Sequence, residues 1–149
     1  MKVMLLSFLM SACSVALAND TPTETEPSAA QRMAAATSAI QAKSWALAIT
    51  ELKATVKVDP RNADAHNLLA YSYRKQSKPD LPMAFEHYRM ALNLNPNHKG
   101  AHEYIGEAYL MDNKPAEAEK HLVELKRICG NTTCEEYVDL AQAIAKFKP

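Results

Sequence analysis

The stretch AHNLLAYSY at residues 65–73 recurs as AHEYIGEAY at residues 101–109, which lies 36 positions later. In each copy a large apolar residue and a tyrosine lie four positions apart, as Leu69 and Tyr73 do in the first. A helix with 3.6 residues per turn places such a pair on one face. The small residue after the apolar one leaves room for a second helix to approach. The pattern therefore predicts a repeated packing helix and not a catalytic motif.

The residues that follow each copy also correspond to one another. Small and large packing residues recur after the two copies at nearly the same offsets, namely Ala84, Tyr88, Ala91 and Pro96 after the first and Ala118 and Leu122 after the second. Each unit is therefore predicted to consist of two helices joined by a turn.

This pattern resembles the tetratricopeptide repeat. The loose signature of that family places a bulky residue, Leu, Gly or Ala, and Tyr on the first helix, then Ala, an aromatic residue, Ala and a closing Pro on the second. The resemblance implies an all-α, right-handed solenoid of helical hairpins, with about three units and a C-terminal capping helix. We expect repeats near residues 29–62, 63–98 and 99–130 and a cap helix over residues 133–148, within a domain over 28–149.

The first 18 residues have the features of a secretory signal peptide. Lys2 precedes a short apolar run, and the run ends in Ala-Leu-Ala before a polar residue. We expect cleavage after Ala18, a flexible leader over residues 19–27, and export, most simply to the bacterial periplasm. The alternative is a lipid anchor at Cys13, whose surroundings faintly resemble a lipoprotein box. The protein would then be a lipid-anchored assembly factor of an envelope complex.

Charge and motif content argue against several functional classes. Without Lys2 the chain has 16 basic and 17 acidic residues, so nothing in its net charge favours binding to nucleic acid or to an anionic membrane surface. The N-terminal apolar run is too short for a stable membrane-spanning helix, and we expect no membrane span. No G-x-S-x-G, H-E-x-x-H or phosphate-binding glycine loop occurs. We therefore expect a monomer without catalytic residues, cofactor or metal.

Two histidines invite a metal-binding interpretation. His66 and His102 occupy the same position in successive repeats, where the family carries a large packing residue. The remaining histidines have no Cys or carboxylate at a spacing that would complete a zinc site. The sequence therefore favours a packing role for both.

Two cysteines remain after removal of the signal peptide. Cys129 is predicted to end one helix and Cys134 to begin the next, with Gly130 in the left-handed turn between them. We expect a structural disulfide, as is usual in exported chains. The alternative is a thiol-redox pair, although C-x4-C is not the C-x-x-C of thioredoxin-like enzymes. Thr133 and Glu136 form a possible capping box for the last helix.

The resemblance also implies where a partner would bind. In this family the first helices of successive repeats line a concave groove, and we expect a non-enzymatic scaffold that holds a peptide or helix of a partner protein there. Met33 and Thr37 stand where members that grip a C-terminal carboxylate use Lys and Asn, which argues against that clamp. The expected groove residues are Asn67, Tyr71, Arg74, Lys75, Glu103, Glu107 and Met111, with Met33, Thr37 and Ile40 in the first repeat.

Overall fold

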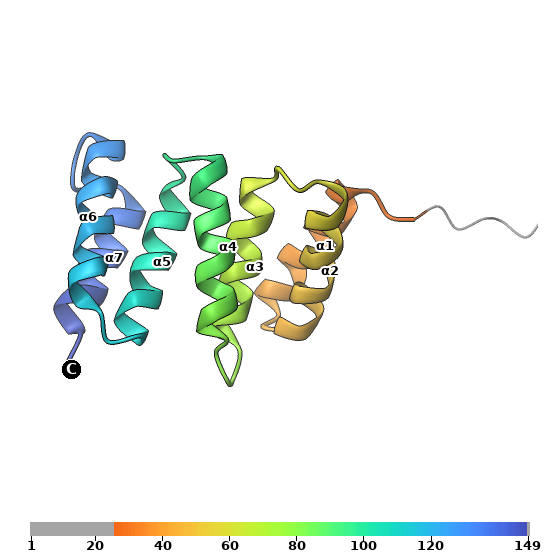
Figure 1. Ribbon diagram of the computed structural model, residues 1–149, viewed down its shortest axis with the longest axis horizontal. Coiled ribbons are helices and arrows are strands. Elements are labelled where there is room, and N and C mark those ends of the chain that lie inside the picture. The colour runs from red at the N-terminus through yellow and green to blue at the C-terminus, as the bar shows by residue number, and fades with distance from the viewer. Residues whose placement is uncertain (1–25, 149) are drawn as a thin grey trace, which may run out of the picture.

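The computed structural model describes residues 26–148, and within that range the chain forms seven α-helices and no β-strand. Figure 1 shows the helices standing side by side, from α1 and α2 at one end to α6 and α7 at the other. The predicted signal peptide, Cys13 and nearly all of the predicted leader lie outside the described residues. The helices are α1 (Ala29–Gln41), α2 (Trp45–Val58), α3 (Ala63–Lys75), α4 (Leu81–Leu94), α5 (Lys99–Met111), α6 (Pro115–Cys129) and α7 (Glu135–Lys146).

Side-chain caps begin four of the helices in residues 26–148, α1, α3, α4 and α5. The Ser28 hydroxyl accepts a hydrogen bond from the Gln31 backbone N–H at 3.2 Å, and the Gln31 side chain accepts one from Ser28 N–H at 2.8 Å. This is the predicted capping box. The Asn62 side chain likewise accepts from Ala65 N–H at 2.9 Å and begins α3. These contacts satisfy backbone donors that the first helical turn leaves free.

Two hydroxyl side chains near helix starts do not cap, and one of them is the predicted cap at Thr133. Ser44 precedes α2, but its hydroxyl makes no capping hydrogen bond. Thr133 lies outside α7, whose N-cap is Cys134. The reason is local, because the Asn131 side-chain oxygen accepts from both the N–H of Thr133 at 2.9 Å and its hydroxyl at 3.0 Å. That turn holds Thr133 one residue before the N-cap, with its hydroxyl donating to Asn131 instead of accepting from the helix.

Turns end the hairpins much as the sequence indicates. Helix α2 stops at Val58, just before the residue that precedes Pro60. Gly130 adopts a left-handed conformation with φ of 68°, which lets the chain reverse after α6. The loop between α3 and α4 is longer than the other two hairpin loops and extends beyond them in Figure 1. Asp80 N–H donates to the carbonyl of Tyr73 at 3.1 Å and closes this loop.

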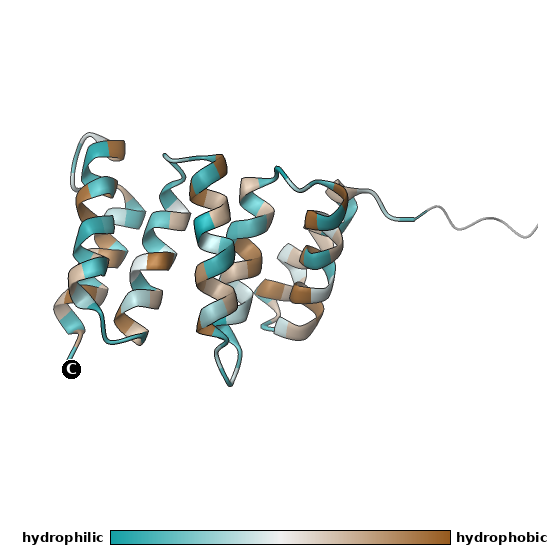
Figure 2. Cartoon of the chain, in the orientation of Figure 1, coloured by the Kyte–Doolittle hydropathy of each residue, from teal (hydrophilic) through white to brown (hydrophobic). Residues whose placement is uncertain are grey.

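The helices pack as successive hairpins. Helix α1 packs on α2, α3 on α4 and α5 on α6, and each hairpin also contacts the next. Apolar and polar residues alternate around each helix (Figure 2), as expected for helices with one buried side. One core lies among α1, α2 and α3, around Leu52 and Leu69. A second lies among α3, α4 and α5, around Tyr88 and Ile105.

The depth of burial differs from the expectation for the repeated tyrosines. Tyr73 and Tyr109 pack against the second core but are only partly buried. The fully buried tyrosine is Tyr88 on α4, which lies between α3 and α5. In the first repeat Ala36 and Ala39 are buried, so that end has small side chains where the later repeats have larger ones.

Helix α7 covers the last hairpin by packing on α5 and α6. Its Leu140 is fully buried and lies over Gly106 of α5. A Cβ at Gly106 would come 2.7 Å from both methyl carbons of Leu140, which is closer than carbon atoms approach. The glycine therefore allows α7 to take the place of the first helix of a further repeat.

Candidate functional site

A row of aromatic side chains runs across three helices. The ring centroids of Trp45 on α2 and Tyr71 on α3 lie 6.0 Å apart in an edge-on arrangement. Tyr71 in turn lies 4.8 Å from Tyr104 on α5. All three residues are partly exposed. Contacting aromatic rings that remain partly exposed offer apolar area to a ligand at little cost in side-chain entropy.

Arg74 is held beneath this aromatic row. Its guanidinium carbon lies 5.4 Å from the Tyr71 ring centroid and 5.7 Å from that of Tyr104. The guanidinium pairs with the Glu107 carboxylate at 2.5 Å, and its Nε donates to the buried Tyr88 hydroxyl at 3.3 Å. The pair satisfies a charge that would be costly to bury alone. Arg74 therefore joins α3 to α4 and α5 and fixes the rings above it.

The structure brings most of the predicted groove residues together but changes their exposure. Lys75 lies 5.8 Å from the Tyr71 ring, and the Met111 sulfur lies 4.0 Å from Arg74. Lys75 and Met111 are exposed, and Tyr71 and Glu107 are partly exposed. The expectation that all of them point outward is wrong for three side chains, which neighbouring helices cover. These are Asn67, Arg74 and Glu103, which are 5%, 5% and 8% exposed.

Glu103 is the most perturbed acid of the described residues. Burial first, and then the charges of Glu107, Asp139 and Glu136, raise the pKa of its carboxyl to about 8, while Arg74 opposes them. No group of residues 26–148 forms a hydrogen bond or ion pair with this carboxyl. Burial, with Glu103 next in effect, also raises the pKa of Tyr104 to about 12. A buried carboxyl without a donor is unfavourable for folding and marks a candidate site.

The repeated histidines form pairs that link the two helices of a hairpin. His66 Nδ1 lies 3.1 Å from His87 Nδ1, and His102 Nδ1 lies 2.9 Å from His121 Nδ1. The Nε2 atoms of His66 and His102 lie 3.1 and 2.9 Å from backbone carbonyls of prolines. A carbonyl only accepts, so each of these Nε2 atoms carries the hydrogen and each Nδ1 accepts from the partner ring. The histidines are thus packing residues with a defined tautomer.

In the first repeat an arginine and a glutamate stand where the later repeats have a histidine pair. There Arg32 on α1 pairs with Glu51 on α2 at 3.4 Å.

Burial followed by the charge of His102 lowers the pKa of His121 to about 4, and burial followed by the charge of His66 lowers the pKa of His87. His87 and His121 are consequently neutral at neutral pH. The longer α3–α4 loop places His87 and His121 only 34 residues apart, whereas their partners lie 36 apart, which hid the correspondence in the sequence.

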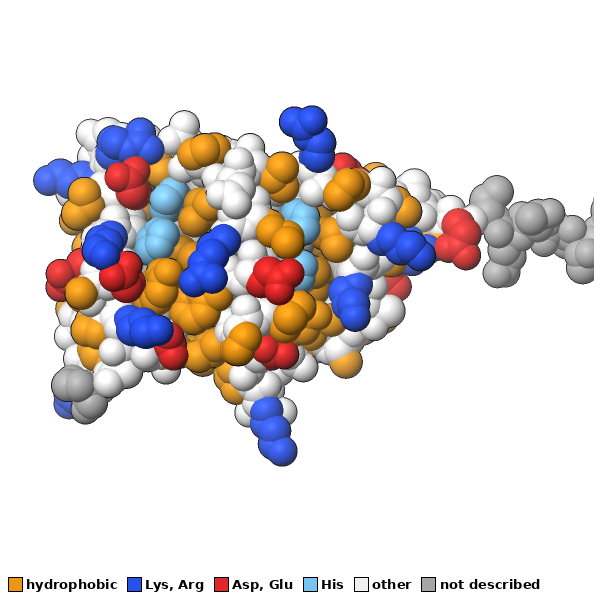
Figure 3. Space-filling view, in the orientation of Figure 1, with side chains coloured by type: hydrophobic (Ala, Val, Ile, Leu, Met, Phe, Trp, Pro, Cys, Tyr) orange, Lys and Arg blue, Asp and Glu red, His pale blue; other side chains and the backbone are white. Residues whose placement is uncertain are grey.

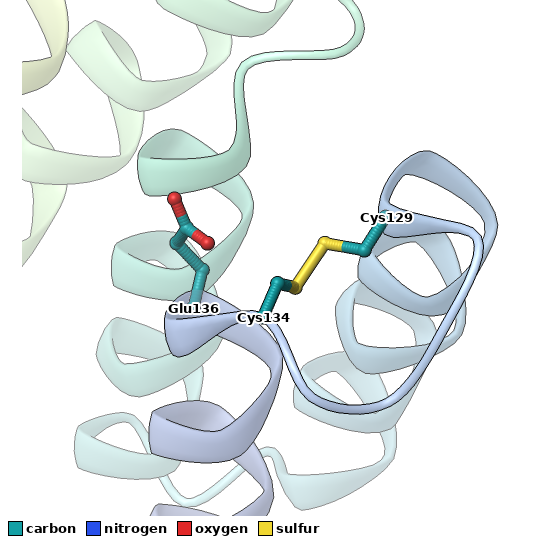
Figure 4. Close-up of side chains that lie close together, drawn as sticks. All are labelled: Cys129, Cys134 and Glu136. Carbon is teal, nitrogen blue, oxygen red and sulfur yellow. A yellow bond between two sulfur atoms is a disulfide. The ribbon is translucent and has the colours of Figure 1, made fainter.

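Cys129 and Cys134 lie close together at one end of the described structure. The Cα atoms of Cys129 and Cys134 lie 6.3 Å apart with their sulfur atoms at bonding distance (Figure 4). Glu136 lies within 4.8 Å of both sulfurs and 3.8 Å from Lys99 Nζ on α5. Bonded sulfurs lack the thiolate that binds metals, so this group would offer a metal a single carboxylate.

The visible surface carries no dominant charge. Acidic, basic and apolar side chains are interspersed on the face drawn in Figure 3, and histidines reach that surface at two separate places. The described residues enclose no pocket. None of the helices in residues 26–148 has the length and apolar character required to cross a membrane. A ligand would therefore bind across an open surface rather than inside a cavity.

Comparisons with known proteins identify the repeat. The tetratricopeptide repeat family matches residues 33–98. The Tetratricopeptide repeat protein 21 homolog of Caenorhabditis elegans is 31% identical over 84 residues, which are 56% of this chain and 6% of that protein. This chain thus spans a small fraction of the length of that relative.

Solved structures show the same architecture. MamA from residue 41 to its end, from Desulfovibrio magneticus RS-1, gives a TM-score of 0.64 at 20% identity, covering 70% of this chain and 58% of that one. The TPR2B domain of yeast Sti1, in its pHsp70 complex, gives a TM-score of 0.67 at 18% identity, covering 76% and 96%. At such identities the similarity shows the fold alone, and it confirms the predicted all-α solenoid of helical hairpins.

Proposed function

Because the chain is a tetratricopeptide repeat protein, we propose that it is a non-enzymatic scaffold that binds a segment of a partner protein across α3 and α5. The observation that carries this proposal is the aromatic row of Trp45, Tyr71 and Tyr104, partly exposed and held from below by Arg74. Clustered aromatic side chains with an arginine are typical of the residues that dominate binding energy at protein interfaces.

The open shape of the surface suits an extended or helical segment. Without an enclosed pocket, a small molecule would leave most of its area in water, whereas a segment several residues long can contact successive helices. The Sti1 domain with a similar fold was solved in a complex with pHsp70, which supports the choice of a protein ligand. Lys75 and Met111 are exposed near the row and extend the contact area.

We also propose that the protein acts after export. The apolar N-terminal run with its Ala-Leu-Ala end supports secretion to the periplasm, or to another oxidising compartment. The proximity of Cys129 and Cys134 supports a structural disulfide there, which would tie the start of α7 to the end of α6. A mature chain that begins with a lipid-modified Cys13 would replace the freely diffusing form with an anchored one.

Affinity capture from the exported fraction of the native host tests the scaffold function. Three baits are compared, namely the wild type, Tyr71→Ala and Val123→Ser. Val123→Ser is the control, because it removes an exposed apolar side chain from α6, away from the aromatic row. A partner that binds the aromatic row is retained by the wild type and by Val123→Ser and is lost with Tyr71→Ala. Circular dichroism first establishes that all three baits are folded. Equal capture by Tyr71→Ala, or loss with Val123→Ser instead, would place binding elsewhere.

A further inference from the structure

Two buried acceptors without donors lie along the proposed binding surface. Glu103 as a whole residue is 8% exposed, and its carboxyl has neither a hydrogen bond nor an ion pair within residues 26–148. Asn67 occupies the equivalent position on α3, is 5% exposed, and its side-chain oxygen also has no donor among the described residues. Its amide nitrogen lies beside Gly100, one turn before Glu103 on α5. Folded proteins rarely leave such atoms unsatisfied, because each costs free energy.

The charges around Glu103 are unbalanced. Glu107 on the same helix and Glu136 and Asp139 on α7 all lie near enough to act on its carboxyl. Arg74 is the neighbouring cation from α3, but it is already bound to Glu107 and Tyr88. Lys99 Nζ lies 3.8 Å from the Glu136 carboxylate and forms no ion pair with Glu103. A positive group supplied from outside would therefore gain more here than a neutral or negative one.

The neighbouring rings suit the rest of a basic side chain. Tyr104 follows Glu103 directly on α5 and is 4.8 Å from Tyr71, and both rings already stack with the Arg74 guanidinium. Lysine and arginine carry apolar stems below their charged heads, and such stems pack on exposed aromatic rings while the head reaches an acid. The surface thus combines an acceptor with an apolar platform beside it.

From this arrangement we infer that the surface of α3, α5 and α7 recognises a lysine or arginine side chain of the partner segment, with its charged head at Glu103 and its stem on Tyr104. The inference rests on the proposed scaffold function and specifies the chemistry of its ligand. The leader of this chain is an unsuitable occupant, because residues 19–25 contain acidic side chains and no basic one. A basic segment of another protein supplies the missing charge.

Binding of a cation should release a proton. In the free protein the raised pKa keeps Glu103 largely protonated at neutral pH, and a bound ammonium or guanidinium group favours the ionised carboxylate. Arg74, Glu107, Glu136 and Asp139 are the other charged groups that face it, and they are present in both states. We expect release of about one proton per complex at pH 7, and affinity that rises with pH toward 8.

A random dodecapeptide library displayed on phage, selected against the folded full mature chain, tests the inference. We expect the selected peptides to share a lysine or arginine and to bind Glu103→Gln about 10- to 100-fold more weakly than the wild type. Replacing that shared basic residue by glutamine in the synthetic peptide should weaken binding to the wild type equally and have little further effect on Glu103→Gln. Glu119→Gln, the same change at an exposed position of α6, should bind normally. Calorimetry in two buffers of different ionisation enthalpy counts the released proton.

The outcomes separate this inference from the function on which it rests. If peptides are selected and lose binding with Tyr71→Ala, but carry no shared basic residue or bind Glu103→Gln equally, the scaffold function stands and the basic-ligand inference is wrong. If the folded wild type selects no peptide, or only peptides insensitive to Tyr71→Ala, both are wrong. A melting curve for each variant ensures that loss of binding does not reflect unfolding.

Discussion

Replacing Glu103 by glutamine should stabilise the free protein at alkaline pH. The folded pKa of about 8 lies above the unfolded value of 4.5, so the folded state binds the proton more tightly than the unfolded state between these values. Stability contributed by this group is therefore present below pH 4.5 and is lost as pH rises through 8. Glutamine has nearly the same shape and stays neutral, so Glu103→Gln should not suffer this loss.

The size of the effect follows from the pKa difference. Each pKa unit corresponds to about 1.36 kcal/mol, so a rise from 4.5 to about 8 sets an upper limit of roughly 5 kcal/mol. Water at the edge of the surface screens the charge and the surroundings relax on ionisation, which lowers the expected value to about 2 kcal/mol. At pH 4.5 the wild type and the variant should differ by less than about 0.5 kcal/mol.

Urea unfolding followed by circular dichroism, at pH 4.5 and at pH 9, measures this difference. Other ionising groups, including the histidine pairs, titrate in both proteins, so subtracting the two curves isolates Glu103. Glu119→Gln controls for loss of a negative charge at an exposed position and should follow the wild type. The reasoning is refuted if Glu103→Gln and the wild type lose the same stability between the two pH values, since Glu103 would then be ionised without penalty.

Three further predictions concern the packing of the hairpins. Gly106→Ala should destabilise the protein by about 1–2 kcal/mol in urea unfolding, because the new Cβ would overlap the buried leucine of α7. Alanine favours helices over glycine, so the overlap has to outweigh that gain. Unchanged stability would show that α7 shifts freely. Changing Cys129 and Cys134 together to serine should lower the free energy of unfolding by about 2 kcal/mol, by the loop-entropy relation, and increase hydrogen exchange in α7. Two titratable thiols in the native protein would contradict the disulfide. His121→Asn should lose about 1–2 kcal/mol less stability than the wild type between pH 7 and pH 4. The folded pKa of about 4 lies below the unfolded value of 6.5, so protonation of this histidine favours unfolding of the wild type. Parallel stability curves for the two proteins would contradict the lowered pKa.

The repeated spacing of packing residues was sufficient to predict the helices. A large apolar residue and a tyrosine four positions apart, as at Ile105 and Tyr109, lie on one face of a helix, and this holds whatever the helix packs against. Proline and glycine acted as equally local signals, since Pro60 restricts the residue before it and Gly130 accepts a positive φ. The predicted cap at Thr133 is wrong because the turn at Asn131 places Thr133 one residue before the N-cap, Cys134.

The candidate site was predicted only in part. Periodicity placed Tyr71, Arg74, Glu103 and Glu107 on one side of their helices, and the structure does bring Tyr71, Arg74 and Glu107 together. Periodicity gave no measure of how deeply a side chain lies, because depth depends on how closely the next helix approaches. The hydrogen bond from Arg74 to Tyr88 joins α3 to α4. The residue pattern of one helix does not specify where the other helix lies.

The sequence by itself determined the all-α repeat, the helix ends set by proline and glycine, and the closeness of two cysteines across a short turn, because all of these depend on contacts between residues close in the chain. Only the tertiary structure decided which polar atoms are left without partners. Asn67 and Glu103 occupy equivalent positions and neighbouring helices cover both residues, but only the Asn67 side-chain oxygen is fully buried without a donor among the described residues. Burial and hydrogen bonding at such positions are properties of the packed assembly of helices, and they depend on distances that the order of residues does not specify.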